Sequence, residues 1–246
     1  MSAVPSPPVR PQVRAVIQCA MPEEAAPFLG ALGPDVATTV VGAEGRHQQS
    51  LTLGRLGEAT VLVVTSGIGL ANSAAATARA LALADAEIII AAGTTGGLGA
   101  DVEVGDVIAG TSVTYSNADA TAFGYARGQV PQMPVDYRSS EPAARRAAGL
   151  AVRVAGLAVR VGQVVSSDSF VTADNVGTTR EEFPDALATD METAALAEVA
   201  WSAGVDWISL RAVSDLCGPA ADQDFHMDSD DAARISFDAV VAFLAG

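Results

Sequence analysis

The chain has 246 residues, of which half are apolar and 17% are charged, so one large domain can bury a substantial core. Its 14 basic residues face 29 acidic ones, and the formal charge of −15 disfavours nucleic acid and anionic membranes as partners. Two cysteines and two histidines are too few for a disulfide framework or a metal cluster, so we expect no metal and no cofactor. No apolar run approaches the ~20 residues of a membrane-spanning helix, and we expect a cytoplasmic protein.

Strand-like and helix-like segments alternate along the chain. Strands are predicted at 13–20, 60–66, 87–92, 106–115, 158–166 and 206–213, with a short one running into Asp190. Helices are predicted at 23–31, 71–84, 141–155, 193–203 and 230–244. This alternation predicts an α/β fold: a single-domain, three-layer sandwich at 13–246, with helices flanking a mixed, largely parallel central sheet. The Pro-rich residues 1–12 are predicted to be a flexible tail.

Two regions depart from this rhythm. Short strand-like pieces at 36–41 and 49–56, joined by Gly-rich turns, predict an antiparallel part of the sheet. The segment 116–138 has no clear periodicity, and its length favours a functional or interfacial role over that of a simple connector.

Three turns follow predicted strands, at 20–24, 66–69 and 93–97, and two of them contain several glycines. Glycines let backbone N–H groups approach a ligand closely, although each turn alone is equally well explained as a tight strand-to-helix connection. No G-x-G-x-x-G opens a helix, so a dinucleotide site is the weaker interpretation. The turns hold no Arg or Lys, which argues against a phosphate clamp and indicates water as the simplest nucleophile.

Carboxylates lie at the same predicted strand ends and helix starts. Glu24 falls in the first turn of a predicted helix, where a purely helix-stabilising role is the alternative. Glu192 begins another helix, and Asp215 follows Ser214 just beyond a buried strand. A carboxylate is costly to bury without a partner, so these groups are candidates for binding a polar ligand. For Arg211 the simpler interpretation is that it neutralises such buried carboxylates.

Taken together, these residues resemble the purine nucleoside phosphorylase/nucleosidase superfamily, and within it the 5′-methylthioadenosine/S-adenosylhomocysteine nucleosidases. The similar pieces follow one another in order over nearly the whole chain. They are AMPEE (20–24), SGIG (66–69), GTTGGL (93–98), VGDVI (104–108), ADATAFGYARGQVP (118–131), SSDSFV (166–171), DMET (190–193) and RAVSD (211–215).

The resemblance implies hydrolysis of the N-glycosidic bond of 5′-thio-substituted adenosines, which releases adenine. It assigns the catalytic roles to Asp215 as general acid on the adenine, Ser214 as its orienting partner and Glu24 as the base that activates water. It implies a substrate-binding set around the base, the sugar and the water. That set is Glu192 and Met191 at the ribose, Phe170 and Val171 at the adenine, Ile68, Thr94 and Thr95 near the sugar and water, and Arg211 beside the carboxylates.

The resemblance also implies a homodimer with shared active sites. Phe123, Tyr125 and Pro131 would then close the 5′-alkylthio pocket of the neighbouring subunit, with ordinary loop packing as the alternative. The partners are therefore a small-molecule nucleoside, water and a second copy of the chain. Thr94-Thr95 and Asp190 depart from the family's usual residues, and Phe225 or Met227 is expected to supply an apolar lid.

Three other functions remain open at this point. A hydrolase of futalosine-type nucleosides or a nucleoside phosphorylase would use the same fold. A nucleoside-binding protein without turnover would need neither Glu24 nor Asp215 as acid and base. A dinucleotide-binding oxidoreductase is suggested only by the glycine turns and the α/β rhythm.

Overall fold

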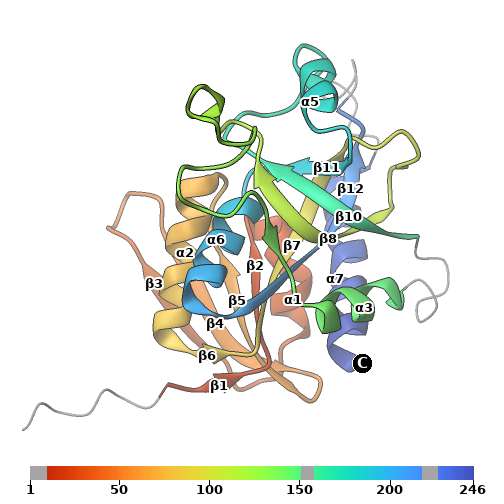
Figure 1. The fold of residues 1–246 in the computed structure, drawn as a ribbon. Helices are drawn as coiled ribbons and strands as arrows, with labels where there is room; N and C mark the ends of the chain where they lie inside the picture. The colour runs from red at the N-terminus through yellow and green to blue at the C-terminus, as the bar shows by residue number, and fades with distance from the viewer. Residues whose placement is uncertain (1–9, 151–157, 218–226) are drawn as a thin grey trace, which may run out of the picture.

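The computed structural model, shown in Figure 1, describes residues 10–150, 158–217 and 227–246. Four parallel strands form the centre of its 10-stranded sheet. They are β5 (Ala59–Thr65), β2 (Ala15–Cys19), β7 (Ile88–Gly97) and β12 (Asp206–Asp215). Because they run in the same direction, their carboxyl ends meet at one edge, where open α/β sheets bind ligands.

The two flanks of the sheet make it mixed. On one side, β4 (Gln49–Leu56) pairs antiparallel with β5, and β3 (Ala37–Val41) pairs antiparallel with β4. On the other, β8 (Val107–Tyr115) runs antiparallel to β12 and parallel to β10 (Val159–Ser166). Strand β11 (Ala186–Asp190) pairs with β10 and also with the end of β7, so β7, β12, β8, β10 and β11 close on themselves.

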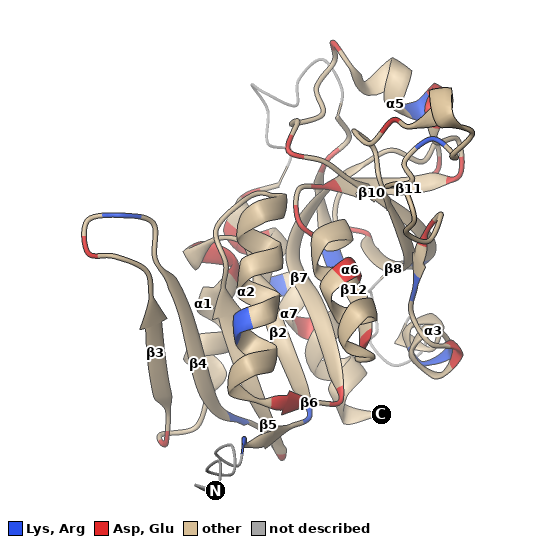
Figure 2. Ribbon diagram, turned by 60° about the vertical axis from the view of Figure 1, so that its left-hand side comes forward, with Lys and Arg blue, Asp and Glu red and all other residues tan. Residues whose placement is uncertain are grey.

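Helices cover both faces, as the predicted three-layer sandwich requires. Helices α2 (Leu70–Leu83) and α6 (Thr193–Ala203) lie side by side on one face (Figure 2). Helices α1 (Pro22–Ala31), α3 (Glu141–Ala148) and α7 (Ser229–Ala245) cover the other. Buried alanines on α2 and α6 let these two helices pack closely on the sheet.

The predicted elements match the structure closely in most places. The expected antiparallel part of the sheet is β3 and β4. The turn predicted at 93–97 is wrong, because β7 continues through it to Gly97 and pairs there with β12 and β11. Helix α5 (Val176–Glu182) was not predicted, because its sequence VGTTREE carries no repeating apolar face.

The segment 116–138 contains only a short 3-10 turn, η1 (Thr121–Phe123), and the two-residue strand β9 (Tyr137–Arg138). Towards the N-terminus, β1 (Gln12–Val13) pairs with β6 (Asp85–Ala86), so Gln12 is part of a strand. Residues 1–9 of the predicted tail, 151–157 of the predicted helix and the lid candidate Phe225 lie outside the described residues. Among the described residues, no helix combines the length and apolarity needed to cross a membrane.

Candidate active site

A pocket of about 280 Å³ opens at the carboxyl ends of the central parallel strands. The structure brings together there all eleven catalytic and substrate-binding residues that were predicted within one subunit. They are Glu24, Ile68, Thr94, Thr95, Phe170, Val171, Met191, Glu192, Arg211, Ser214 and Asp215.

The Glu24 carboxylate accepts four hydrogen bonds, two from the turn after β2 and two from strand β7. Its Oε2 accepts from the backbone N–H groups of Ala20 (2.9 Å) and Met21 (3.1 Å), just after β2. Its Oε1 accepts from the N–H (2.8 Å) and the hydroxyl (2.9 Å) of Thr94 in β7. A Cβ on Gly93 would lie 2.3 Å from the carboxyl carbon, so only glycine leaves room for this group. Glu24 therefore stabilises the helix start and also faces the pocket.

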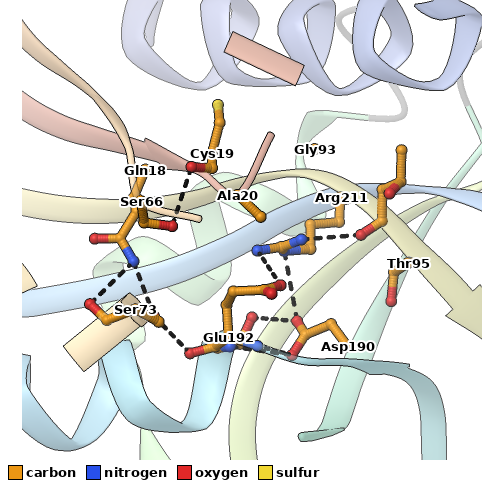
Figure 3. A network of polar contacts seen from close by, with 12 residues as sticks. Gln18, Cys19, Ala20, Ser66, Ser73, Gly93, Thr95, Asp190, Glu192 and Arg211 are labelled. Atoms are coloured by element: carbon orange, nitrogen blue, oxygen red, sulfur yellow. Dashed lines mark hydrogen bonds and ion pairs between the residues drawn. The ribbon is translucent and has the colours of Figure 1, made fainter. Parts of the chain in front are cut away.

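Glu192, Asp190 and Arg211 form a buried charged cluster (Figure 3). The Arg211 guanidinium lies 3.2 Å from Glu192 Oε2 and 3.4 Å from Asp190 Oδ2, and it donates to the Thr94 carbonyl at 3.0 Å. Glu192 Oε1 also accepts from the N–H of Gly69, at the N-terminus of α2 (3.0 Å). Arg211 thus lies against the carboxylates, as a neutralising role requires.

Asp190 has a full set of hydrogen bonds, although its role was in doubt from the sequence. Its Oδ1 accepts from the Ser166 hydroxyl (2.6 Å) and from the N–H groups of Glu192 (3.2 Å) and Thr193 (3.0 Å). The Thr193 hydroxyl donates to its other oxygen. Asp190 therefore binds the first turn of α6 and faces Arg211 at the same time.

Burial raises the pKa of the Glu192 carboxyl to about 7, because a charged group is costly to remove from water. Arg211 opposes this rise, Asp190 adds to it, and the hydrogen bond from Gly69 opposes it. Burial also acts to lower the pKa of Arg211, but the carboxylates of Asp190 and Glu192 outweigh it, so the pKa lies above its ordinary value. Arg211 therefore stays cationic, whereas Glu192 titrates near neutral pH.

An irregularity in β12 determines the direction of the Asp215 side chain. The pairing of β12 with β7 shifts between Val213 and Asp215, so Ser214 is an extra residue opposite β7. Both side chains line the pocket, and the Ser214 hydroxyl lies 3.0 Å from Asp215 Oδ2. The N–H of Cys217 donates to Oδ1 at 2.9 Å. The expectation that Asp215 lies beyond its strand is therefore wrong, because the bulged strand includes it.

Cys217 is a pocket residue that the sequence reasoning missed. It is buried, and its φ of 53° lies in the left-handed region, which residues other than glycine seldom adopt. A Cβ on Gly96 would lie 2.5 Å from its sulfur, so the thiol fills the space above that glycine. Its position two residues after Asp215 is the sequence feature that could have predicted its place in the pocket.

Apolar side chains form the mouth of the pocket. Phe170 and Ile68 line it while about half of each side chain stays exposed, and Val171 is buried beside them. Met191 and Thr95 also line the pocket, and the Thr95 hydroxyl donates to the Thr189 carbonyl at 2.8 Å. An exposed aromatic ring at a pocket mouth provides a flat apolar face for stacking.

The three residues assigned to a neighbouring subunit do not line the pocket of their own chain. Phe123, in η1, is 84% exposed, while Tyr125 is half-buried and Pro131 is exposed. Met227 lies against Gly105 and does not line the pocket either.

The charges in the pocket are strongly unbalanced. Glu24, Asp190, Glu192 and Asp215 contribute four carboxyl groups, and among the described lining residues Arg211 is the one cation. No group of three or more His, Cys, Asp or Glu side chains within the described residues is arranged to hold a metal ion. A pocket of this kind favours a neutral or cationic ligand over an anionic one.

Comparison with known proteins agrees with this geometry. The family model of the phosphorylase superfamily matches residues 14–245. A 5′-methylthioadenosine/S-adenosylhomocysteine nucleosidase of Staphylococcus aureus (strain MRSA252) is 37% identical over 193 residues, which cover 78% of this chain and 84% of that protein. The chain belongs to the phosphorylase superfamily, in its 5′-methylthioadenosine/S-adenosylhomocysteine nucleosidase family.

Solved structures of the nucleosidase family share the fold. The Neisseria meningitidis nucleosidase in complex with methylthio-immucillin-A superposes with a TM-score of 0.83 at 33% identity, covering 93% of this chain and 97% of that one. An S-adenosylhomocysteine nucleosidase from Streptococcus pyogenes, in complex with 5-methylthiotubericidin, gives 0.85 at 29% identity and covers 95% and 96%. The predicted α/β sandwich is therefore confirmed.

Proposed function

We propose that the protein hydrolyses the N-glycosidic bond of 5′-thio-substituted adenosines, such as 5′-methylthioadenosine and S-adenosylhomocysteine, and releases adenine. One observation carries the proposal: Glu24 and Asp215 are fixed by hydrogen bonds in the same pocket, with Glu192 beside them. An acid, a base and a group that binds the sugar are what this reaction requires of a protein. The family membership supports the same reaction.

The chemistry uses these groups in a definite way. As the bond between C1′ and N9 breaks, positive charge develops on the ribose and negative charge on the purine. Asp215 donates a proton to N7 of the adenine, with Ser214 and the Cys217 N–H orienting the carboxyl group. Glu24 takes a proton from the water whose oxygen bonds to C1′. The products are adenine and the 5′-thio-ribose.

Glu192 and its neighbours bind the sugar and the base in this proposal. Glu192 accepts hydrogen bonds from the ribose hydroxyls, and its negative charge stabilises the developing cation. Met191 packs beside the sugar, and Phe170 stacks on the adenine while Val171 offers backbone groups to its edge. Arg211 offsets the charge of Asp190 and Glu192, which permits both to be buried.

The attacking water must share Glu24 with Thr94. A carboxylate has about four lone-pair sites, and all four accept hydrogen bonds here. The three backbone donors are fixed, but a hydroxyl hydrogen rotates freely. Thr94 is therefore the donor that turns towards the water and leaves one lone pair of Glu24 Oε1 available.

Water, and not phosphate, is the nucleophile in this proposal. Charge-assisted contacts from Arg or Lys strengthen phosphate binding, and here Arg211 is already placed between two carboxylates. The test is to incubate the protein with methylthioadenosine in phosphate-free buffer and measure free adenine by chromatography. Turnover that requires phosphate and yields a ribose 1-phosphate would make the protein a phosphorylase. Binding without release of adenine would make it a nucleoside-binding protein.

The same assay ranks the substrates. Methylthioadenosine, adenosylhomocysteine, deoxyadenosine and aminofutalosine are compared side by side at equal concentration. The half-exposed apolar side chain of Ile68, which is placed near the sugar, favours a thioether at the 5′ position. A clear preference for aminofutalosine would replace the proposed substrate class with the futalosine-type one.

The active unit in this proposal is a homodimer. Phe123 exposes 84% of its side chain, and Val135, Phe170 and Ile68 each expose about half. Phe123 and Val135 lie in the segment 116–138 and the other two at the pocket mouth, and contact with a second copy would cover such exposed apolar groups. Phe123, Tyr125 and Pro131 of one copy would cover the 5′-alkylthio end of the pocket in the other.

Hybrid dimers test this arrangement directly. Glu24→Gln dimers should be nearly inactive, and Phe123→Ala dimers should show a KM for methylthioadenosine raised by about 10-fold, because an aromatic contact is lost. Unfolding and refolding a mixture should restore one normal site per hybrid, with intact Glu24 from one chain and intact Phe123 from the other. If the mixture only averages the two parents, the sites are not shared.

A further inference from the structure

Gln18 is a buried amide that the proposed chemistry does not use. It lies in β2, is 1% exposed, and points to the same face of the sheet as the apolar Val16. Burying an amide is unfavourable unless its donors and acceptor are satisfied, so its partners reveal why a polar group is tolerated here. One of those partners, Ser73, also contacts Glu192.

The contacts form a chain with a fixed donor direction (Figure 3). Gln18 Nε2 donates to the hydroxyl of Ser73 at 2.8 Å and lies 3.3 Å from the Ser73 carbonyl. Gln18 Oε1 accepts from the Thr77 hydroxyl at 3.0 Å. An amide nitrogen can only donate, so the single hydroxyl proton of Ser73 is left for its other partner, the Glu192 carbonyl at 2.9 Å.

Without Gln18, the Ser73 hydroxyl could donate to a different acceptor. Serine and threonine in helices commonly donate back to the carbonyl one turn earlier, and the Thr77 hydroxyl lies 2.9 Å from such a carbonyl, that of Ser73, with one proton to share between it and Gln18 Oε1. The Gln18 amide occupies the Ser73 hydroxyl oxygen and keeps the hydroxyl directed at α6. The first turn of α2 therefore binds Glu192 twice, at the carboxylate through the Gly69 N–H and at the carbonyl through Ser73.

Strand β2 contacts both Glu24 and, through Ser73, Glu192. The backbone N–H groups that follow Gln18 by two and three residues, at Ala20 and Met21, hold Glu24. Gln18 links the same strand to Glu192 through Ser73. We propose that Gln18 is a positioning residue that sets the place of the Glu192 carboxylate relative to Glu24 by fixing the Ser73 hydroxyl. The inference rests on the proposed nucleosidase activity.

The test compares Gln18→Met, which keeps the length of the side chain but removes the amide, with the wild-type protein. Methylthioadenosine and its 2′,3′-dideoxy analogue are assayed in parallel. Loss of one positioned hydrogen bond is expected to raise the KM for methylthioadenosine by about 5- to 10-fold. The dideoxy analogue has no hydroxyls for Glu192 to bind, so its KM should change by less than about twofold.

Two further variants keep the result decisive. Ser73→Ala should reproduce the effect of Gln18→Met, and the double variant should be no worse than either, because both act through one hydrogen bond. Val16→Ala, a buried neighbour on the same face of β2, should lower thermal stability without changing the ratio between the two substrates. If Gln18→Met does not fold, Ser73→Ala carries the test.

Equal losses for both substrates, or additive losses in the double variant, would overturn the proposed role of Gln18. A wild-type protein that releases no adenine would instead overturn the nucleosidase proposal. The two failures are therefore distinct.

Discussion

The two ends of the pocket are built on different principles. The inner end, formed by Glu24, Asp190, Glu192 and Arg211, is buried, and its charged groups are held by hydrogen bonds and ion pairs within one chain. The outer end, formed by Ile68 and Phe170, is apolar and half exposed. In the proposed function, one chain supplies the groups that act on the sugar and the water, whereas the exposed mouth is the part that a second copy would cover.

The largest expected effect comes from removing the acid or the base. Asp215→Asn and Glu24→Gln should each lower kcat by about 10²- to 10⁴-fold, because an amide can neither protonate N7 nor take a proton from water. Adenine release at saturating substrate measures both. Binding of methylthioadenosine by Asp215→Asn should stay largely intact.

The adjacent, exposed Glu23 is the matched control for Glu24. Glu23→Gln should keep the wild-type rate, since its side chain does not line the pocket. Exposed Asp174 serves Asp215 in the same way through Asp174→Asn. A wild-type rate for Asp215→Asn would remove this residue from the mechanism and leave the proposed reaction without a general acid.

A second prediction uses the pKa of Glu192, which only the buried inner end could raise to about 7. Above that pH the carboxylate accepts from the ribose hydroxyls, and below it the protonated form binds them less well. The value of kcat/KM should therefore fall as pH decreases below about 7, approaching tenfold per pH unit. A pH series on methylthioadenosine measures this.

Glu192→Gln should be slower throughout and should lack the acidic decline near pH 7, because an amide does not titrate. An unchanged decline in that variant would assign it to another group. The pH dependence would then not report the protonation of Glu192.

The smallest effect is expected at Thr94, whose hydroxyl is the adjustable donor to Glu24. Thr94→Val should lower kcat by about 3- to 10-fold through loss of one hydrogen bond, and Thr94→Ser should stay within about twofold. Single-turnover rates on methylthioadenosine compare the two. A valine variant faster than wild type would show that the hydroxyl obstructs the water.

The sequence alone was informative where local rules decide. Helix α6 and strand β4 have the predicted bounds, because a continuous apolar face or an alternating pattern is a local property. The turn predicted at 93–97 is wrong because glycines there serve a strand: Gly93 leaves room for Glu24, and Gly96 for the Cys217 thiol. That need arises from residues far away in the chain.

The candidate site shows the same division. Motif similarity predicted that Glu24, Glu192 and Asp215 act on one ligand, and their residue types determine what chemistry they can perform. Only the tertiary structure decided that a bulge at Ser214 aims Asp215, that Asp190 binds α6 and faces Arg211, and that Gln18 reaches Glu192 through Ser73. Those contacts join strands and helices distant in sequence, and burial gives them their energy, so no local pattern could contain them.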